Sequence, residues 1–216
     1  MSATSARRLV LSTVDWAALR TAPEPPPPVA ALLRPTVGIR FEVAVGDRGL
    51  RASYAVAGPA GASLFELADG AVELSAFDPV DLGRELVRAV PPLPGRINQA
   101  LHGTRPVPSG TLPLSALTDV KLGGTVDALA AEVDERTTGV LRCLVTGRVP
   151  DGSADGSVAV GQVVWLAVGH AWVGLRPEPA PDGRRQVALV PVDRADIGGW
   201  LAPYLSELLE VSGGRG

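Results

Sequence analysis

Two stretches in the first third of the chain alternate apolar and polar side chains with a period of two. This alternation is typical of strands that expose one face. Their apolar positions are Val37, Ile39, Phe41, Val43 and Val45, then Leu50, Ala52, Tyr54 and Val56. A turn at residues 46–49 separates them, and further strands are predicted near 62–68 and 71–77, joined by the turn-forming pair Asp69-Gly70. The short connections predict antiparallel pairing.

A helix is predicted to begin after residue 78. Asp78 provides a side-chain cap, Pro79 suits the first helical position, and Asp81 favours the positive end of the helix. The apolar stripe consists of Leu82, Leu86 and Val90. Pro91-Pro92 ends the helix, and residues 91–113, rich in Pro and Gly, are predicted to form a long loop.

The second half repeats this order of strands and capped helix. Strands are predicted near 158–168, 171–177 and 185–192, and a helix begins at Asp193, with Pro203 expected to kink or restart it. Its apolar stripe comprises Ile197, Trp200, Leu201, Tyr204, Leu205, Leu208 and Leu209. Between the halves, a helix capped by Thr125 carries the stripe Val126, Leu129, Ala130 and Val133, and residues 150–157 form a loop.

The two halves also share residues at a constant offset of 115. The identical pairs are Leu74/Leu189, Asp78/Asp193, Asp81/Asp196, Gly83/Gly198 and Leu86/Leu201. Strand-to-helix junctions share generic capping chemistry, which is one explanation of the match. The other is a duplicated β-strands-then-helix unit. It predicts an α+β fold, with a central, mainly antiparallel sheet, helices packed on it, and a pseudo-two-fold axis between the two units.

The prolines at 23 and 25–28 predict a stiff, extended linker. We therefore divide the chain into three parts. Residues 1–28 are an N-terminal segment and linker, and residues 212–216 are a flexible tail. Residues 29–211 form a single α+β domain whose repeat halves are about 37–90 and 158–210.

The amino-acid composition argues against nucleic acid as a partner and against a membrane location. The chain has 216 residues, a net charge of −3 and 46% hydrophobic residues, which supports a real core and argues against a nucleic-acid surface. Basic residues are nearly all arginine, as in high-GC bacteria such as actinobacteria. The apolar run after Arg7-Arg8 is cut by Asp15 and is too short for an export signal, and no stretch is long enough to span a membrane. These features predict a cytoplasmic protein.

Residues that commonly carry chemistry are few and lack motif context. The only histidines are His102 and His170, and Cys143 is a lone cysteine in an apolar stretch, so a buried thiol is expected. Helix capping explains the paired aspartates at 78/81 and 193/196. The sequence therefore predicts no catalytic residue, no cofactor and no metal site, and hence a protein that is not an enzyme.

The aromatic residues are more informative than the histidines. Nine of the 216 residues are aromatic and four of those are tryptophans. Trp165 and Trp172 fall on adjacent predicted strands, on the parity opposite the aliphatic residues. Either a helix of this chain covers them, or they form an exposed patch for a partner together with Arg176. In the second case Trp165, Trp172 and Arg176 are the partner-binding residues.

Three stretches resemble the EspG family, the ESX (type VII) secretion-associated proteins of actinobacteria. They are 29–35 with the strands at 37–45 and 51–56; 64–92 followed by 111–117; and 161–209. The chain departs from the family in two places. The family's longer helical N-terminus is replaced by about 28 residues, and its Asp-Thr signature is missing near Trp165–Trp172, where Gly169 and Trp172 remain.

The resemblance implies a divergent, N-terminally shortened EspG-like member. Its implied role is that of a cytosolic chaperone or adaptor that binds a secreted helical protein through apolar contacts before export. The alternative is a non-catalytic structural or assembly protein of the same secretion system. Neither nucleic acid nor stable membrane insertion is expected, and the sequence leaves the oligomeric state open.

Overall fold

The computed structural model describes residues 8–93, 106–117, 127–148 and 157–213; the side chains of 157, 207 and 209–213 lie outside this description. The predicted Thr125 cap, Val126 and the Leu209 side chain therefore fall outside the described part, as does His102.

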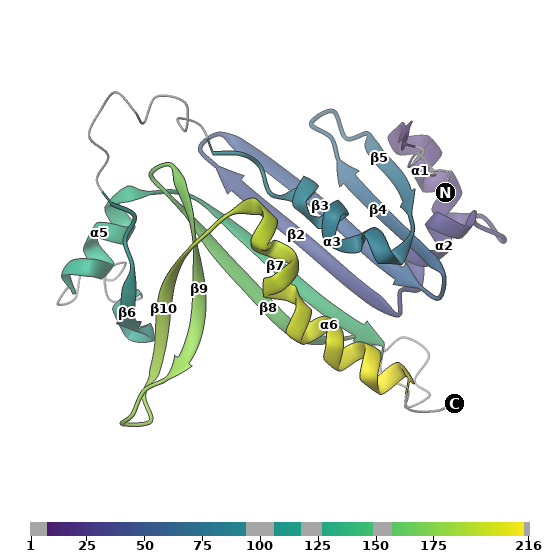
Figure 1. Cartoon of the computed structure of the whole chain (residues 1–216). Coiled ribbons are helices and arrows are strands. Elements are labelled where there is room, and N and C mark those ends of the chain that lie inside the picture. The colour runs from purple at the N-terminus through teal and green to yellow at the C-terminus, as the bar shows by residue number, and fades with distance from the viewer. Residues whose placement is uncertain (1–7, 94–105, 118–126, 149–156, 214–216) are drawn as a thin grey trace.

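In the described part of the chain, ten strands form one antiparallel sheet in the order β1-β5-β4-β3-β2-β7-β8-β9-β10-β6 (Figure 1). The strands are β1 Arg8–Leu11, β2 Val37–Val45, β3 Arg48–Ala57, β4 Ala60–Glu66, β5 Val72–Phe77, β6 Gly110–Pro113, β7 Thr137–Arg148, β8 Ser157–Val168, β9 Ala171–Pro179 and β10 Arg185–Val192. The predicted α+β class and antiparallel pairing are confirmed. Two strands were not predicted: β6 lies in the expected long loop, and β7 occupies the stretch around Cys143.

The strand order is symmetric about the boundary between β2 and β7. Four consecutive strands lead outward on each side, β2 to β5 and β7 to β10, and each set ends in a capped helix. Helices α3 and α6 meet at Gly83 and Gly198, two residues related by the offset of 115, where a Cβ on Gly198 would lie 3.8 Å from Gly83 Cα. In this order β7 is the counterpart of β2, so the second unit begins well before the predicted residue 158. Superposition of the two units stays a prediction.

Several helical segments begin where a side chain accepts from the free N–H groups of the first turn. Asp78 Oδ1 accepts from the Val80 N–H at 3.1 Å, and Asp193 forms a capping box with Asp196. Asp127 caps α5 by accepting from Leu129 and Ala130. The helical segments are α1 Thr13–Thr21, α2 Pro27–Leu33, η1 Pro79–Asp81, α3 Leu82–Leu86, η2 Val87–Ala89, α5 Ala128–Arg136, η4 Arg194–Asp196 and α6 Ile197–Gly213. α6 continues through Pro203, so the helix does not restart there.

The N-terminal segment is part of the sheet. β1 pairs antiparallel with β5, from Arg8 opposite Ser75 to Leu11 opposite Val72. Two of the prolines expected in the linker, Pro27 and Pro28, instead form the first turn of α2, where a missing N–H costs nothing. The predicted separation of residues 1–28 from the body therefore does not describe how the chain packs.

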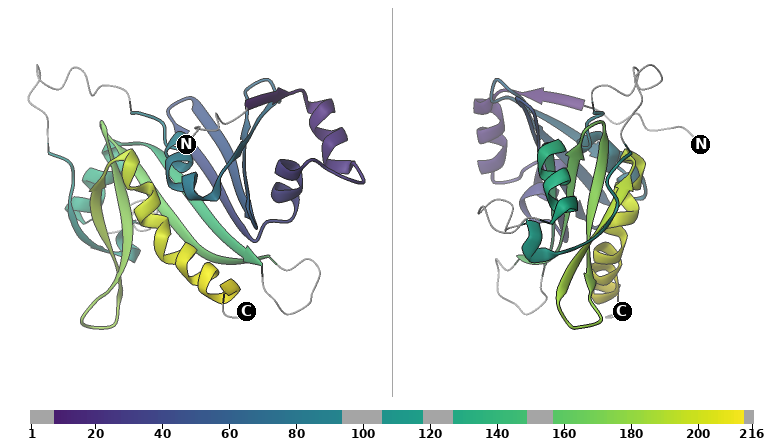
Figure 2. Two further views of the ribbon diagram at one scale, coloured as in Figure 1. Left: turned by 45° about the vertical axis from the view of Figure 1, so that its right-hand side comes forward. Right: turned by 90° about the vertical axis from the view of Figure 1, so that its left-hand side faces the viewer.

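Helices cover the two sides of the sheet unequally. The largest core cluster lies on the side of α3 and α6 and includes Phe41, Tyr54, Leu86, Trp165 and Leu201. On the opposite side, α1 and α2 cover the end near β1 and β5, and α5 covers the end near β9 and β10. Figure 2 shows α6 on one side of the sheet and α1, α2 and α5 on the other. No helix of the described residues lies over the middle of that second side.

Candidate functional site

Trp165 and Trp172 lie in the core. Trp165 is 0% exposed and Trp172 is 3% exposed. The Trp172 Nε1–H donates to the Pro91 carbonyl oxygen at 3.2 Å, and the Trp165 ring meets Trp200 of α6 edge-on at 5.9 Å between ring centroids. The chain's own helices therefore cover these side chains, and the alternative in which they form an exposed patch is wrong for both tryptophans.

Arg176 is the only one of the three predicted binding residues that lies at the surface. Its guanidinium carbon stands 4.9 Å from the centroid of the Trp200 ring, a distance at which a cation is attracted to an aromatic face. The prediction that Arg176 contacts a partner is compatible with its position, whereas the tryptophans beside it serve to pack α6.

A second surface, which the sequence did not single out, lies on the uncovered middle of the sheet. We call it the central face: the side chains of β2, β3, β4, β7 and β8 that point away from α3 and α6 and lie under no helix. Its residues are Arg40, Glu42, Ala44, Arg51, Ser53, Glu66, Val140, Arg142, Leu144, Gln162 and Val164, all exposed or half-buried.

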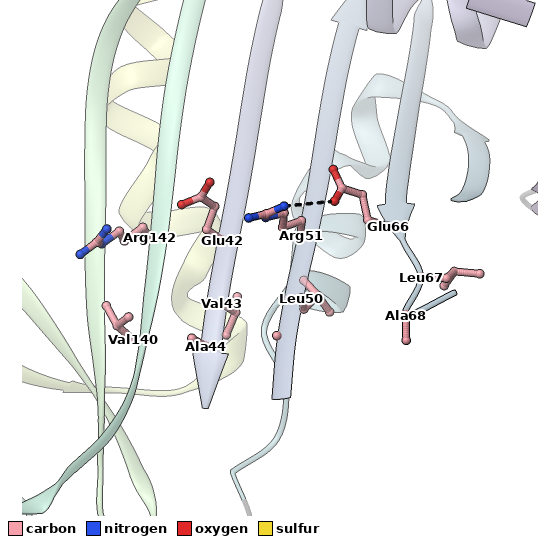
Figure 3. Close-up of a pocket in the computed structure, with 11 residues that line it drawn as sticks. Glu42, Val43, Ala44, Leu50, Arg51, Glu66, Leu67, Ala68, Val140 and Arg142 are labelled. Carbon is pink, nitrogen blue, oxygen red and sulfur yellow. Dashed lines mark ion pairs between the residues drawn. The ribbon is translucent and has the colours of Figure 1, made fainter. Parts of the chain in front are cut away.

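Four charged residues cross the central face in one row of alternating sign. The register places Arg142 opposite Glu42, Glu42 opposite Arg51, and Arg51 opposite Glu66, on β7, β2, β3 and β4 (Figure 3). Arg51 Nη1 lies 3.7 Å from Glu66 Oε2, with both side chains more than half exposed. Opposite charges on facing strands stabilise the sheet modestly. The row therefore fixes a charge pattern while adding no net charge.

Apolar side chains flank the row. Val140, Leu144 and Val164 are half-buried and belong to none of the core clusters. At the β2–β3 turn end, the row opens onto a shallow cavity of about 490 Å³ lined by Glu42, Ala44, Leu50, Arg51, Glu66, Leu67, Val140 and Arg142, among others (Figure 3). A row of neutralised charges bordered by aliphatic residues is suited to a protein partner.

The ionisable groups of the core hold the structure together. Arg88 of η2 donates to Glu85 at 2.8 Å, pairs with Glu73 of β5, and stands 4.8 Å from the Phe65 ring centroid. Burial lowers the pKa of Arg88, but its hydrogen bonds to the two carboxylates outweigh this and raise it overall. The Tyr54 hydroxyl donates to the Glu85 carbonyl at 2.8 Å, and burial raises its pKa. These contacts fix α3 and η2 over β3 to β5.

The fold places Cys143 and His170 in different surroundings. Cys143 is buried in the core between Phe41 and Val163, and burial raises the pKa of its thiol, which makes it a poor nucleophile. His170 is exposed at the β8–β9 turn, so the two do not share a site.

Among the described residues, no group of three or more His, Cys, Asp or Glu side chains is arranged to hold a metal ion. Nor does any described helix combine the length and apolar character needed to cross a bilayer.

The fold is similar to that of a solved secretion chaperone. The chain superposes on the Mycobacterium tuberculosis type VII secretion system chaperone EspG5, solved in complex with the PE25–PPE41 dimer, with a TM-score of 0.57 and 9% sequence identity. The match covers 85% of this chain and 76% of EspG5. At this identity the likeness shows a shared fold, and it agrees with the resemblance seen in the sequence.

Other comparisons add little. The di-domain ARO/CYC protein StfQ from the steffimycin biosynthetic pathway aligns over 95% of this chain and 94% of its own at 13% identity, but its TM-score of 0.23 is too low to indicate a shared fold. No family model matches the chain, and no curated protein matches it in sequence.

Proposed function

We propose that this chain is a cytosolic chaperone or adaptor of type VII (ESX-like) secretion that holds a helical secreted protein against its central face. The observation that carries the proposal is that, among the described residues, no helix covers the middle of one side of the sheet, whereas α3 and α6 cover the other side. The EspG5-like fold supports the class of partner, because EspG5 was solved with the PE25–PPE41 dimer.

The chemistry of the central face suits a helical partner. The aliphatic residues Val140, Leu144 and Val164 offer apolar area, while the charge row from Arg142 to Glu66 sets the orientation and register of what binds. Because two arginines alternate with two glutamates, the row attracts no large excess of counterions. Binding is therefore expected to depend only weakly on salt.

The first test is purification of the chain from its native host with everything that remains bound. The proposal predicts a small helical secreted protein, recovered at one-to-one stoichiometry. Recovery of a membrane ATPase of the secretion machinery instead would favour the alternative, a structural or assembly protein of the same system. Recovery of a metabolite would point to a ligand-binding protein and contradict both.

A charge-swapped variant links the bound protein to the central face. In this variant, which we call the row-swapped chain, all four signs are reversed by Arg142→Glu, Glu42→Arg, Arg51→Glu and Glu66→Arg. Every cross-strand neighbour within the row still has the opposite charge, so stability should change little. A partner whose charges complement the row would face like charges in this variant. It should therefore be lost from the purified complex.

A further inference from the structure

The ladder between β8 and β9 is much shorter than either strand. It joins only Trp165–Val168 to Ala171–Gly174, four residue pairs, so residues 157–164 of β8 and 175–179 of β9 diverge without pairing to each other. The counterpart ladder between β3 and β4 contains seven pairs. Figure 1 shows β9 and β10 swinging away from β8.

A cavity of about 380 Å³ occupies the point of divergence. It is lined by Gln162 and Val163 of β8, by Leu175, Arg176 and Pro177 of β9, and by Gly199, Trp200, Pro203 and Tyr204 of α6. Adjacent residues of a strand point to opposite faces of the sheet. Because such neighbours line the cavity on both strands, it lies between the two strand edges. We call it the split.

The β8 edge of the split carries hydrogen-bonding groups that the rest of the sheet uses for pairing, whereas on the β9 edge Pro177 and Pro179 have no N–H, so that edge offers the Leu175 N–H and backbone carbonyl oxygens. Among the described residues, no backbone group of 157–164 bonds across the split to 175–179, and no turn or loop bond fills the space. Open strand edges are templates for an added strand, because an extended backbone satisfies their N–H and C=O groups.

The side chains that line the split determine which side chains an inserted strand could have. Trp200 and Tyr204 of α6 cover it on one side, so alternate side chains of an inserted strand would meet aromatic rings. The Arg176 guanidinium lies against Trp200 at the same cavity, and no carboxylate within the described part of the chain forms an ion pair with it. This charge is complementary to a carboxylate on the incoming segment.

We propose that the split receives an extended segment of a partner protein, which adds a strand between β8 and β9 and places a carboxylate against Arg176. The segment would alternate small apolar residues, facing Trp200 and Tyr204, with polar ones. The charge row takes no part in this site, since Arg176 points to the α6 side of the sheet and the charge row to the other; Gln162 belongs to both the split and the central face.

The probe is a random dodecapeptide library displayed on phage and selected on the full chain. We expect enriched peptides that alternate small apolar residues, such as Val and Ala, with polar residues and that contain Asp or Glu. When these peptides are added as synthetic molecules, amide hydrogen exchange should slow at least tenfold at alternate residues of 157–164 and at Leu175, since Pro177 and Pro179 have no amide hydrogen. The amides of β3 and β4 should not change. Peptides with free and amidated C-termini distinguish a terminal carboxylate from a side-chain one.

Three variants of the chain test which residues bind the peptides. Arg176→Gln should weaken binding of the acidic peptides at least tenfold, whereas Arg20→Gln on the distant helix α1 should leave it unchanged. The row-swapped chain should bind the peptides normally, so failure of this proposal and failure of the proposed function are separable. The inference is overturned if no selected peptide protects the β8 and β9 amides, or if Arg176→Gln binds the acidic peptides as the wild type does.

Discussion

Tyr204 of α6 packs directly on the backbone of Gly161 in β8, where a Cβ atom would lie 2.2 Å from Tyr204 Cδ1. Two neighbouring strands repeat this contact. A Cβ on Gly174 of β9 would meet Trp200 at 2.4 Å, and one on Gly147 of β7 would meet Leu208 at 1.9 Å. Three glycines thus form a track across the sheet that admits the large side chains of α6.

Gly161→Ala is therefore expected to lower the free energy of unfolding by about 1–3 kcal/mol, because the added methyl group overpacks the contact with Tyr204. Denaturant titration measures the change. Gly199→Ala is the matched control: this glycine lies in α6 with open space around its Cα. It should stabilise the chain by up to about 1 kcal/mol through helix propensity. Equal stability of Gly161→Ala and wild type would contradict the packing of α6.

Trp172→Ala should lower the free energy of unfolding by about 3–5 kcal/mol, because the side chain is buried and its Nε1–H bonds to the Pro91 carbonyl. Any loss of binding should follow from unfolding alone. Trp172→Phe keeps most of the volume and should cost less. If Trp172→Ala instead leaves the melting temperature unchanged and weakens the partner tenfold, the tryptophan is a contact residue.

Truncation after Ala202 should yield an insoluble product. It removes Tyr204, Leu205 and Leu208, which are half-buried against the main core cluster, so each contributes part of the roughly 1.5–3 kcal/mol of a fully buried side chain. Solubility and thermal melting of the truncated chain test this expectation. A soluble product with the wild-type melting temperature would show that the second half of α6 is dispensable.

Stability should fall as the pH rises above about 8.5, the ordinary pKa of a cysteine thiol. Burial raises the pKa of Cys143 in the folded chain, so the unfolded chain releases the thiol proton first, and alkaline pH favours unfolding. The slope should be about 1.4 kcal/mol per pH unit. Cys143→Ala should delay the fall to about pH 10, where the buried Tyr54 hydroxyl has the same effect. A fall that begins at pH 8.5 in the variant as well would rule out Cys143 as its source.

The sequence predicted the parts of the fold that local chemistry determines. Period-two alternation identified β2 and β3, and the caps Asp78 and Asp193 identified the starts of two helical segments. β7 was missed because apolar residues on both parities flank Arg142 and hide the alternation, and β6 because four residues beside prolines carry no periodic signal. Both depend on pairing with distant strands.

The site was harder to predict than the fold. Sequence parity placed Trp165 and Trp172 together on one side of the sheet, but which side is covered depends on where α6 packs, and that depends on the glycine track. The charge row escaped notice because Arg142, Glu42, Arg51 and Glu66 become neighbours only through the register of four strands. Each strand contributes only one charged residue to the row, and one charged residue at a polar position of a strand does not reveal a row that crosses four strands.

The most direct test of the central claim is the affinity of the helical protein recovered from the native host for the wild-type and row-swapped chains. Titration calorimetry measures both, with melting curves confirming that the two chains are equally folded. Our account predicts at least tenfold weaker binding by the row-swapped chain, about 1.4 kcal/mol, and little dependence on salt for the wild type. Equal affinity of the two folded chains would contradict it.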